Sequence, residues 1–178
     1  GHTYYVTIDN GVLNLADGSF QGVTKEDEWT FTTKSDMPEL SDTLIVDATG
    51  KGDFNTVQGA LDFIPDFNER QTVILVNPGD YEELVYTRNK WNVKIKGAGM
   101  ADTKVHYANN EVFNPHPLTV KTNEWPGTFP SRRAAFMLDN CKDIVIEDMT
   151  IATDLKGQAE GLLINGERIA LYRVHIIG

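Results

Sequence analysis

The sequence predicts an all-β protein whose main part is a solenoid of stacked strands. The strongest sign is a repeat, because the apolar pattern of residues 142–152 returns 25 positions later in residues 167–177. Four apolar positions keep this spacing: Ile144, Ile146, Met149 and Ile151 recur as Ile169, Leu171, Val174 and Ile176. A period in the twenties with strand-like content is typical of a solenoid, since each coil buries its inner face only against the neighbouring coils.

A second observation is the alternation of side chains in residues 91–96. Val93 and Ile95 point to one side of an extended chain, whereas Lys94 and Lys96 point to the other. Because successive residues of a strand face opposite ways, this pattern indicates a strand with one buried face. Similar runs predict strands at residues 44–46, 72–76, 84–86, 104–107, 134–138, 143–152, 161–164 and 169–177.

The N-terminal residues are expected to form a separate, incomplete unit. Residues 3–9 and 28–33 alternate and are rich in β-branched and aromatic side chains, as strands are. Two or three strands do not make a stable sandwich by themselves. The segment from Thr3 to Lys34 resembles the C-terminal half of a bacterial immunoglobulin-like domain, whose last strand commonly reads Trp-Thr-Phe-Thr-Thr. The expected organisation is a partial immunoglobulin-like domain in 1–34, a linker in 35–42 and the solenoid in 43–178.

A short helix is expected before the main run of strands. Asn55 can cap it, and Pro65 stops it. Between them, apolar residues follow helical spacing at Val57, Ala60, Leu61 and Ile64. A short amphipathic helix in this place suits the plug that closes one end of a solenoid.

Composition and charge exclude several classes of function. The net charge of −10 argues against a nucleic-acid partner and against an anionic membrane surface, both of which favour a basic face. No apolar stretch approaches the ~18 residues of a membrane span. Residues 1–43 hold eight acids and two bases, whereas residues 44–178 hold eighteen and fourteen, so Arg132 and Arg133 could still meet an anionic ligand. Cys141 is alone and is expected to be a small buried residue.

The regular pattern breaks between Asn109 and Arg133, where prolines make strand pairing improbable. A long irregular loop on a rigid scaffold commonly carries function. Trp125 and Phe129 are of the kind that stack on sugar rings, and we predict that they bind substrate. The alternative, that they only hold the loop against the coil wall, stays open.

Residue types alone give little catalytic evidence. The sequence has no nucleophile elbow, no phosphate loop and no metal-ligand cluster, so neither a metal nor a cofactor is expected. Three histidines lie in separate segments, and the aspartates near the strand ends are most simply turn formers at solvated edges. These groups are His106, His116 and His175, and Asp139, Asp143, Asp148 and Asp154.

An ordered set of motifs resembles the pectin methylesterases. Residues 47–65 are similar to the opening of that family, Asn77-Pro78-Gly79-Asp80-Tyr81-Glu82-Glu83 to its Pro-Gly-x-Tyr-x-Glu turn, and 92–97 fit the next coil. Further matches are Asp148-Met149-Thr150-Ile151, Gln158-Ala159-Glu160-Gly161-Leu162 against Gln-Ala-Val-Ala-Leu, and residues 165–173. The resemblance implies a right-handed parallel β-helix and hydrolysis of methyl esters on galacturonan.

The resemblance also assigns one catalytic role. In that family a carboxylate attacks the ester carbonyl, a second aspartic acid acts as general acid and then base, and glutamine amides steady the oxyanion. Gln158 is the residue here that maps onto this machinery, although a polar residue at a coil corner remains the alternative. The family's hydroxyl residue in the substrate groove is missing from Ala134-Ala135-Phe136, where Phe136 is taken as a substrate contact.

The expected function is therefore that of a pectinesterase with pectin or galacturonan as its polysaccharide partner. The catalytic aspartate segments would come after Gly178, so the chain alone is expected to be inactive and to self-associate through its open last strand. A bacterial secreted, periplasmic or cell-surface location is expected. The alternatives are a carbohydrate-binding β-helix without catalysis and another pectin-active β-helix enzyme, a lyase or a galacturonan hydrolase.

Overall fold

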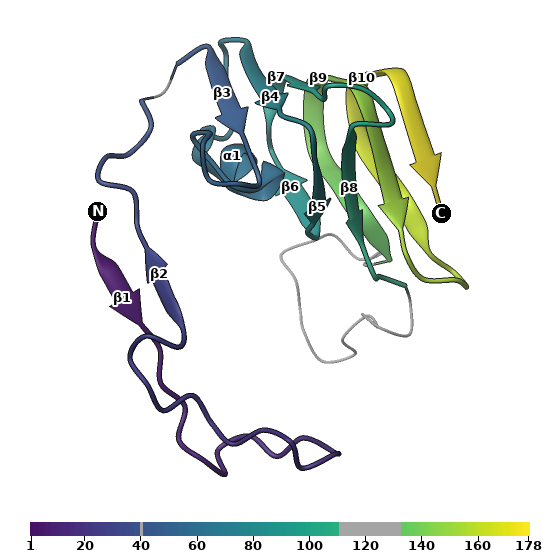
Figure 1. Ribbon diagram of the computed structural model, residues 1–178. Coiled ribbons are helices and arrows are strands. Elements are labelled where there is room, and N and C mark those ends of the chain that lie inside the picture. The colour runs from purple at the N-terminus through teal and green to yellow at the C-terminus, as the bar shows by residue number, and fades with distance from the viewer. Residues whose placement is uncertain (40, 111–132) are drawn as a thin grey trace. The chain divides into compact units, whose positions relative to one another are not determined.

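The computed structural model describes residues 1–39, 41–110 and 133–178, and divides the chain into two compact units (Figure 1). The first unit comprises Gly1–Glu39 and the second Leu40–Gly178. This division lies within the linker expected at 35–42. The loop aromatics Trp125 and Phe129, and also His116, lie outside the described residues.

The first unit is a small antiparallel arrangement. Strand β1 (Thr3–Tyr5) pairs with β2 (Thr30–Thr32), and an isolated bridge joins Ile8 to Val23. The rings of Tyr4 and Phe31 stack with centroids 5.4 Å apart, and both remain about half exposed. The strands are shorter than the alternating pattern predicts, and the immunoglobulin-like assignment stays a prediction.

The second unit is built almost entirely of parallel strands, with one short helix at the end where β3 and β4 lie. Its elements are β3 (Thr43–Val46), α1 (Val57–Phe63), β4 (Thr72–Val76), β5 (Gly79–Glu82), β6 (Val85–Arg88), β7 (Trp91–Lys96), β8 (Thr103–Tyr107), β9 (Ala134–Thr153) and β10 (Glu160–Ile177). All of the described pairings in this unit between β3 and β10 are parallel. Strand β5 is not predicted from the sequence, because its Pro-Gly-x-Tyr pattern is typical of a turn.

These strands form three parallel stacks, which are the three faces of the solenoid. The long strands β9 and β10 each contribute one segment to every face. The first face comprises β3, β4, β7, residues 142–147 of β9 and 167–172 of β10; the second comprises β5, β8, 150–153 and 175–177; the third comprises β6, 136–139 and 162–165. Figure 1 shows β7, β9 and β10 side by side as successive coils. The predicted parallel β-helix is confirmed.

The 25-residue repeat corresponds to one coil. Ile144 pairs with Ile169 and Ile146 with Leu171, while Met149 pairs with Val174 and Ile151 with Ile176. On the first face, a ladder of buried side chains runs through successive coils: Leu44, Ile74, Ile95 and Ile146 are each 0% exposed. Stacking of like apolar residues in register thus forms the core, as the sequence predicts.

Near the start of each of these first-face segments, one residue has a left-handed backbone conformation. Asn92, Asp143 and Arg168 have φ values of 52°, 55° and 51°, and they occupy equivalent corners of three successive coils. Asparagine and aspartate tolerate this conformation better than most residues do. Arg168 spans the gap to the coil below, where its Nε and Nη2 atoms donate to Asp143.

Helix α1 packs its predicted apolar face against the core side chains of β3 and β4. Val57, Ala60, Leu61 and Ile64 are all buried. The predicted cap, Asn55, is wrong by one residue: Thr56 is the N-cap, and its side-chain oxygen accepts the Gly59 N–H. The helix ends at Phe63, ahead of Pro65, which restricts the preceding residue to an extended conformation.

Candidate active site at the start of the third face

Gln158 lies in the connection that leads from β9 into β10, at the entrance to the third face. Its side chain is exposed. Strand β9 ends at Thr153 and β10 begins at Glu160, whose backbone pairs with Ala134 of the preceding coil. Gln158 therefore lies directly beside Arg133, the residue before β9.

Arg133 holds two side chains of the next coil at once. Its Nη1 donates to Oε1 of Gln158 at 2.6 Å, and its Nη2 donates to Oε1 of Glu160 at 2.6 Å. The side chains of Arg133 and Glu160 are 33% and 26% exposed. The three residues form a partly open polar group at the edge of the sheet, which we call the Arg133 cluster (Arg133, Gln158 and Glu160).

The hydrogen bond from Arg133 determines which way the Gln158 amide faces. A guanidinium has donors and no acceptor, so the amide oxygen faces Arg133 and the NH₂ group is turned away from it. An amide N–H that is fixed before reaction can donate to developing negative charge without reorganising. The arrangement is chemically suited to stabilise an oxyanion.

Neighbouring residues hold this corner of the coil in place. Asn109 is 1% exposed, and its Nδ2 donates to the Ala134 carbonyl at 2.8 Å. The Thr153 hydroxyl donates to the Asn109 carbonyl at 2.6 Å. Asn110 donates to the Lys156 carbonyl at 3.0 Å, which ties down the connection that carries Gln158.

The expected role of Phe136 as a substrate contact does not fit its position. The Phe136 side chain is 0% exposed and belongs to the hydrophobic core. It pairs with Val85 on one side and Leu162 on the other, and Val85 is also buried. The ring thus has no free surface for a sugar, because position 136 faces inward on β9.

Asp139 is buried, in contrast to the solvated edge that the sequence suggests. It is 2% exposed, with Oδ2 lying 2.7 Å from Nε of Arg88 and Oδ1 accepting from Nδ2 of Asn165 at 2.7 Å. Arg88, Asp139 and Asn165 occupy equivalent positions on three coils of the third face. Asp139 therefore links the coils.

The other three aspartates of this group also have partners. Asp143 and Asp148 pair with Arg168 and Arg173 of the next coil, and these hydrogen bonds hold the pKa of both carboxyl groups below their ordinary value. Asp154 bonds to Nδ1 of His106, which lowers the pKa of Asp154. These contacts are structural, and they leave no paired free carboxylates among the four.

Both ring nitrogens of His106 face carboxylates, so this histidine is not free to act as a general base. His106 is largely buried between two carboxylates, since its Nε2 lies 2.9 Å from Oδ1 of Asp80 while Nδ1 faces Asp154. His175 lies exposed on the last coil. In residues 1–39, 41–110 and 133–178, no group of three His, Cys, Asp or Glu side chains is arranged to hold a metal ion.

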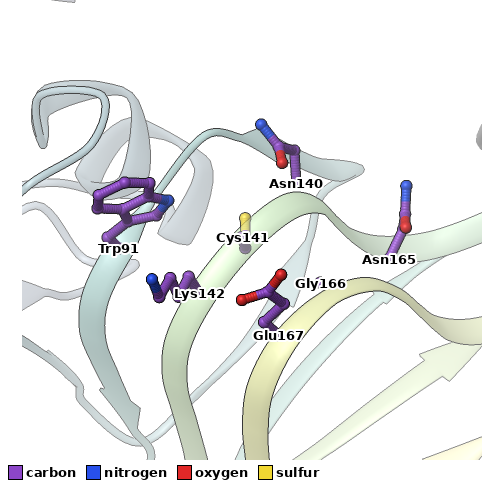
Figure 2. Close-up of a pocket in the computed structure, with 7 residues that line it drawn as sticks. All are labelled: Trp91, Asn140, Cys141, Lys142, Asn165, Gly166 and Glu167. Carbon is purple, nitrogen blue, oxygen red and sulfur yellow. The ribbon is translucent and has the colours of Figure 1, made fainter. Parts of the chain in front are cut away.

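A separate hollow of about 310 Å³ opens at the corner between the third and first faces. Figure 2 shows Trp91, Cys141, Lys142 and Glu167 among the residues that line it. Nζ of Lys142 lies 5.0 Å from the centroid of the Trp91 ring. Two side chains that line this hollow, Asn140 and Asn165, already donate hydrogen bonds to Asn89 and Asp139 of neighbouring coils. Burial also raises the pKa of the Cys141 thiol, which disfavours the reactive thiolate. We therefore place the candidate site at Gln158.

Glu160 is not identified as a site residue from the sequence, and Arg133 is named there only as a residue that could meet an anionic ligand. Arg133 precedes Gln158 by 25 residues, which is the length of one coil, so the repeat itself places them side by side. Glu160 departs from the family pattern, because the resembling motif has Val in its place. The 25-residue period and the replacement of the family's Val by Glu160 were the sequence signals that pointed to these two residues.

No helix in the described ranges is long and apolar enough to cross a membrane.

Comparison with known proteins identifies relatives of the second unit. The family model "Pectinesterase" matches residues 43–178. Probable pectinesterase 8 of Arabidopsis thaliana is 38% identical over 128 residues, which are 71% of this chain and 31% of that protein. Probable pectinesterase 67 of the same plant is 33% identical over 96 residues, 50% of this chain and 28% of that protein. The chain thus spans about a third of the length of these relatives.

Solved structures with the same fold are also pectin methylesterases. The enzyme from carrot matches with a TM-score of 0.60 at 22% identity, over 78% of this chain and 40% of its own. PemA of Erwinia chrysanthemi matches with a TM-score of 0.57 at 22% identity, over 76% of this chain and 43% of its own. Since the family model covers the entire second unit from β3 onward, the chain belongs to the pectinesterase family.

Proposed function

We propose that the protein hydrolyses methyl esters of pectin, with Gln158 as a donor to the oxyanion. The observation that carries this proposal is the orientation of the Gln158 amide, whose oxygen is held by Arg133 at 2.6 Å so that its NH₂ group faces away. Family membership supports the reaction class. A pectin methylesterase of this fold has been solved in complex with a hexasaccharide, which supports a polysaccharide substrate.

The proposed contribution of this chain to the chemistry is electrostatic. When a carboxylate attacks the ester carbonyl, the carbonyl oxygen gains negative charge, and Nε2–H of Gln158 donates to it. A carboxylic acid protonates the ester oxygen as this intermediate collapses, so that methanol leaves and an acyl anhydride remains on the attacking carboxylate. The resulting second carboxylate takes a proton from water, which hydrolyses the anhydride and frees the galacturonate. Of the groups in this sequence, we assign only Gln158 to these steps.

The test is methanol release from methylated pectin by the full-length protein. Replacing Gln158→Ala should lower kcat by ~100-fold to ~1000-fold, as the loss of one oxyanion donor does elsewhere. The matched control is Gln71→Ala, which replaces an exposed glutamine directly before β4 and should keep full activity. Full activity in Gln158→Ala would refute the assigned role, and a full-length protein that releases no methanol would refute the function.

We also propose that Trp125 and Phe129 bind the sugar rings of the substrate. The support is chemical, because an indole or phenyl ring offers an apolar face to the C–H groups of a pyranose. Trp125→Ala should weaken binding of both methylated and de-esterified pectin, whereas Trp29→Ala, at a half-exposed indole of the first unit, should not. Binding that depends on Trp125 without any hydrolysis would favour a carbohydrate-binding module.

Two further proposals concern the surroundings of the protein. We infer that it acts outside the cytoplasm, as a secreted, periplasmic or cell-surface protein, because pectin is an extracellular polymer. We infer a bacterial source because the segment from Thr3 to Lys34 resembles part of a bacterial immunoglobulin-like domain. We also infer that the 178-residue chain by itself associates through the inner face of its last coil. Leu171 and Ile176 are 37% and 44% exposed, whereas their partners in the coil below, Ile146 and Ile151, are 0% exposed.

A further inference from the structure

Glu160, Arg133 and Gln158 form a continuous chain of hydrogen bonds that ends at the proposed oxyanion donor. One arm of the Arg133 guanidinium contacts Glu160 and the other contacts Gln158, each at 2.6 Å. We propose that Arg133 is a positioning residue for the Gln158 amide and that Glu160 holds Arg133 in the required orientation. This inference rests on the proposed function, since it gives the fixed amide its catalytic use.

The geometry of the guanidinium makes the two contacts interdependent. Its donors lie in one rigid plane, and Nη1 and Nη2 point in different directions within it. A rotation that broke the contact to Glu160 would also displace Nη1 from Gln158. The carboxylate therefore limits the orientations of Arg133, and Arg133 in turn limits those of the amide.

The contact has two consequences for the amide. The first is orientation, because an exposed glutamine otherwise samples several rotamers and both flipped states of its amide. The second is polarisation, because a charged donor on the oxygen draws electron density from the nitrogen and strengthens its N–H groups as donors. Both effects favour the transition state, in which the substrate oxygen carries negative charge.

Backbone pairing between neighbouring coils places this cluster. Glu160 pairs with Ala134, and the Glu160 N–H donates to the Arg133 carbonyl at 3.4 Å. Arg133 and Gln158 are one coil apart, as are the ion pairs Asp143 with Arg168 and Asp148 with Arg173. Side chains one coil apart therefore pair at this site, as they do elsewhere in the solenoid, and here one of the two is the proposed catalytic amide.

Stability alone does not account for the cluster. A partly exposed ion pair contributes little to folding, because solvent screens it and two long side chains must be ordered. The side chains of Arg133 and Glu160 are 33% and 26% exposed, whereas Oε2 of Glu160 is buried without a hydrogen-bond partner among the described residues. The thermal unfolding of each variant is therefore measured beside its kcat. The variants therefore separate a positioning role from a structural one.

The kinetic test uses the full-length protein and methylated pectin. Arg133→Met should lower kcat by between ~10-fold and ~100-fold with little change in KM, as misplacement of a catalytic group does. Glu160→Val, which introduces the residue of the resembling motif, should lower kcat less and should have no further effect in the Arg133→Met background. Arg70→Met, which breaks an exposed ion pair with Asp42 elsewhere in the same unit, is the matched control.

A double-mutant comparison decides whether Arg133 acts through Gln158. If it does, Arg133→Met combined with Gln158→Ala should be no slower than Gln158→Ala alone, because the amide that Arg133 positions is already gone. Additive losses in the double variant would overturn the inference, and so would an unchanged kcat in Arg133→Met.

NMR can measure the mobility of the Gln158 amide directly, so the inference can be tested even if the protein shows no esterase activity. The side-chain ¹⁵N–¹H₂ signals of Gln158 should show a rigid amide in the unmodified protein and a mobile one in Arg133→Met, with Gln71 mobile in both. A Gln158 amide that is equally mobile with and without Arg133 would overturn the inference. If the amide is rigid but the full-length protein releases no methanol, the proposed function fails while the positioning by Arg133 stands.

Discussion

Oε1 of Glu83 accepts a hydrogen bond from the backbone N–H of Val57 at 2.8 Å, although the two residues are 26 positions apart. Its second oxygen accepts the N–H of Gln58, also at 2.8 Å. Both donors belong to the first turn of α1, where no intrahelical acceptor is available. The last residue of the Pro-Gly-x-Tyr-x-Glu motif thus fastens the helix to the coil after β5.

Replacing Glu83→Ala should destabilise the second unit by about 1–3 kcal/mol, because two backbone donors would lose their charged acceptor in a buried position. Glu83 is 9% exposed, so water has little access to the vacated groups. Urea unfolding monitored by circular dichroism measures the change. Glu82→Ala, at the exposed neighbour, is the control, and equal midpoints for the two variants would contradict this role of Glu83.

Asp47 makes stability depend on pH in acid. Hydrogen bonds from the Thr49 hydroxyl at 2.6 Å and from Asn77 at 2.8 Å, together with the Thr49 N–H, lower the pKa of Asp47 to about 2. A lowered pKa means that the unfolded chain binds the proton more tightly. The contribution of the Asp47 carboxylate should therefore be complete above the ordinary value of 3.8 and be lost as the pH falls towards about 2.

The measurement for Asp47 is the unfolding free energy between pH 2 and pH 6, from urea titrations at each pH. Asp47→Asn should flatten the acid limb of this profile, whereas Asp102→Asn, at an exposed turn, serves as the control. A ¹³C titration of the Asp47 carboxyl with a midpoint at or above 3.8 would show that these hydrogen bonds do not favour the ionised form.

Gly97 marks a place where two coils come into close contact. A Cβ at this position would lie 2.3 Å from the carbonyl oxygen of Asp148 and 2.9 Å from Cβ of Met149. The Gly97 N–H also donates to the Glu147 carbonyl at 2.9 Å, so the backbone cannot simply move away. Gly97→Ala should lower the unfolding free energy by about 1–3 kcal/mol, as overpacking does. Thermal unfolding with an unchanged Tm would contradict this.

Self-association of the 178-residue chain should depend on the exposed inner face of its last coil. Leu171→Lys and Ile176→Lys place charges on this face, and they should shift the chain to a monomer because a charge is costly to bury in an apolar interface. Sedimentation velocity over a range of concentrations measures the change. Val12→Lys alters a 66% exposed residue of the first unit and is the control. A chain that is monomeric before substitution would contradict the proposed association.

Local pattern in the sequence was enough to predict the coils. The repeat that relates Ile144 to Ile169 and Ile151 to Ile176 is the pairing register in the structure. The alternation in residues 91–96 also separates buried Val93 and Ile95 from outward-facing Lys94 and Lys96. Such predictions succeed because strand alternation and coil length are properties of a short stretch of chain, and both are written in the order of apolar residues.

The remaining features depend on contacts between residues that are far apart in the sequence. The sequence alone does not show that Asp139 is buried between Arg88 and Asn165, that Phe136 faces the core, or that Glu83 caps α1. It named Gln158, but only the stacking of coils brought Arg133 and Glu160 to it. The sequence by itself thus determined that the chain coils and where most strands of the second unit lie. The tertiary structure decided which polar groups meet, because hydrogen-bond partners from different coils are neighbours only after the coils have stacked.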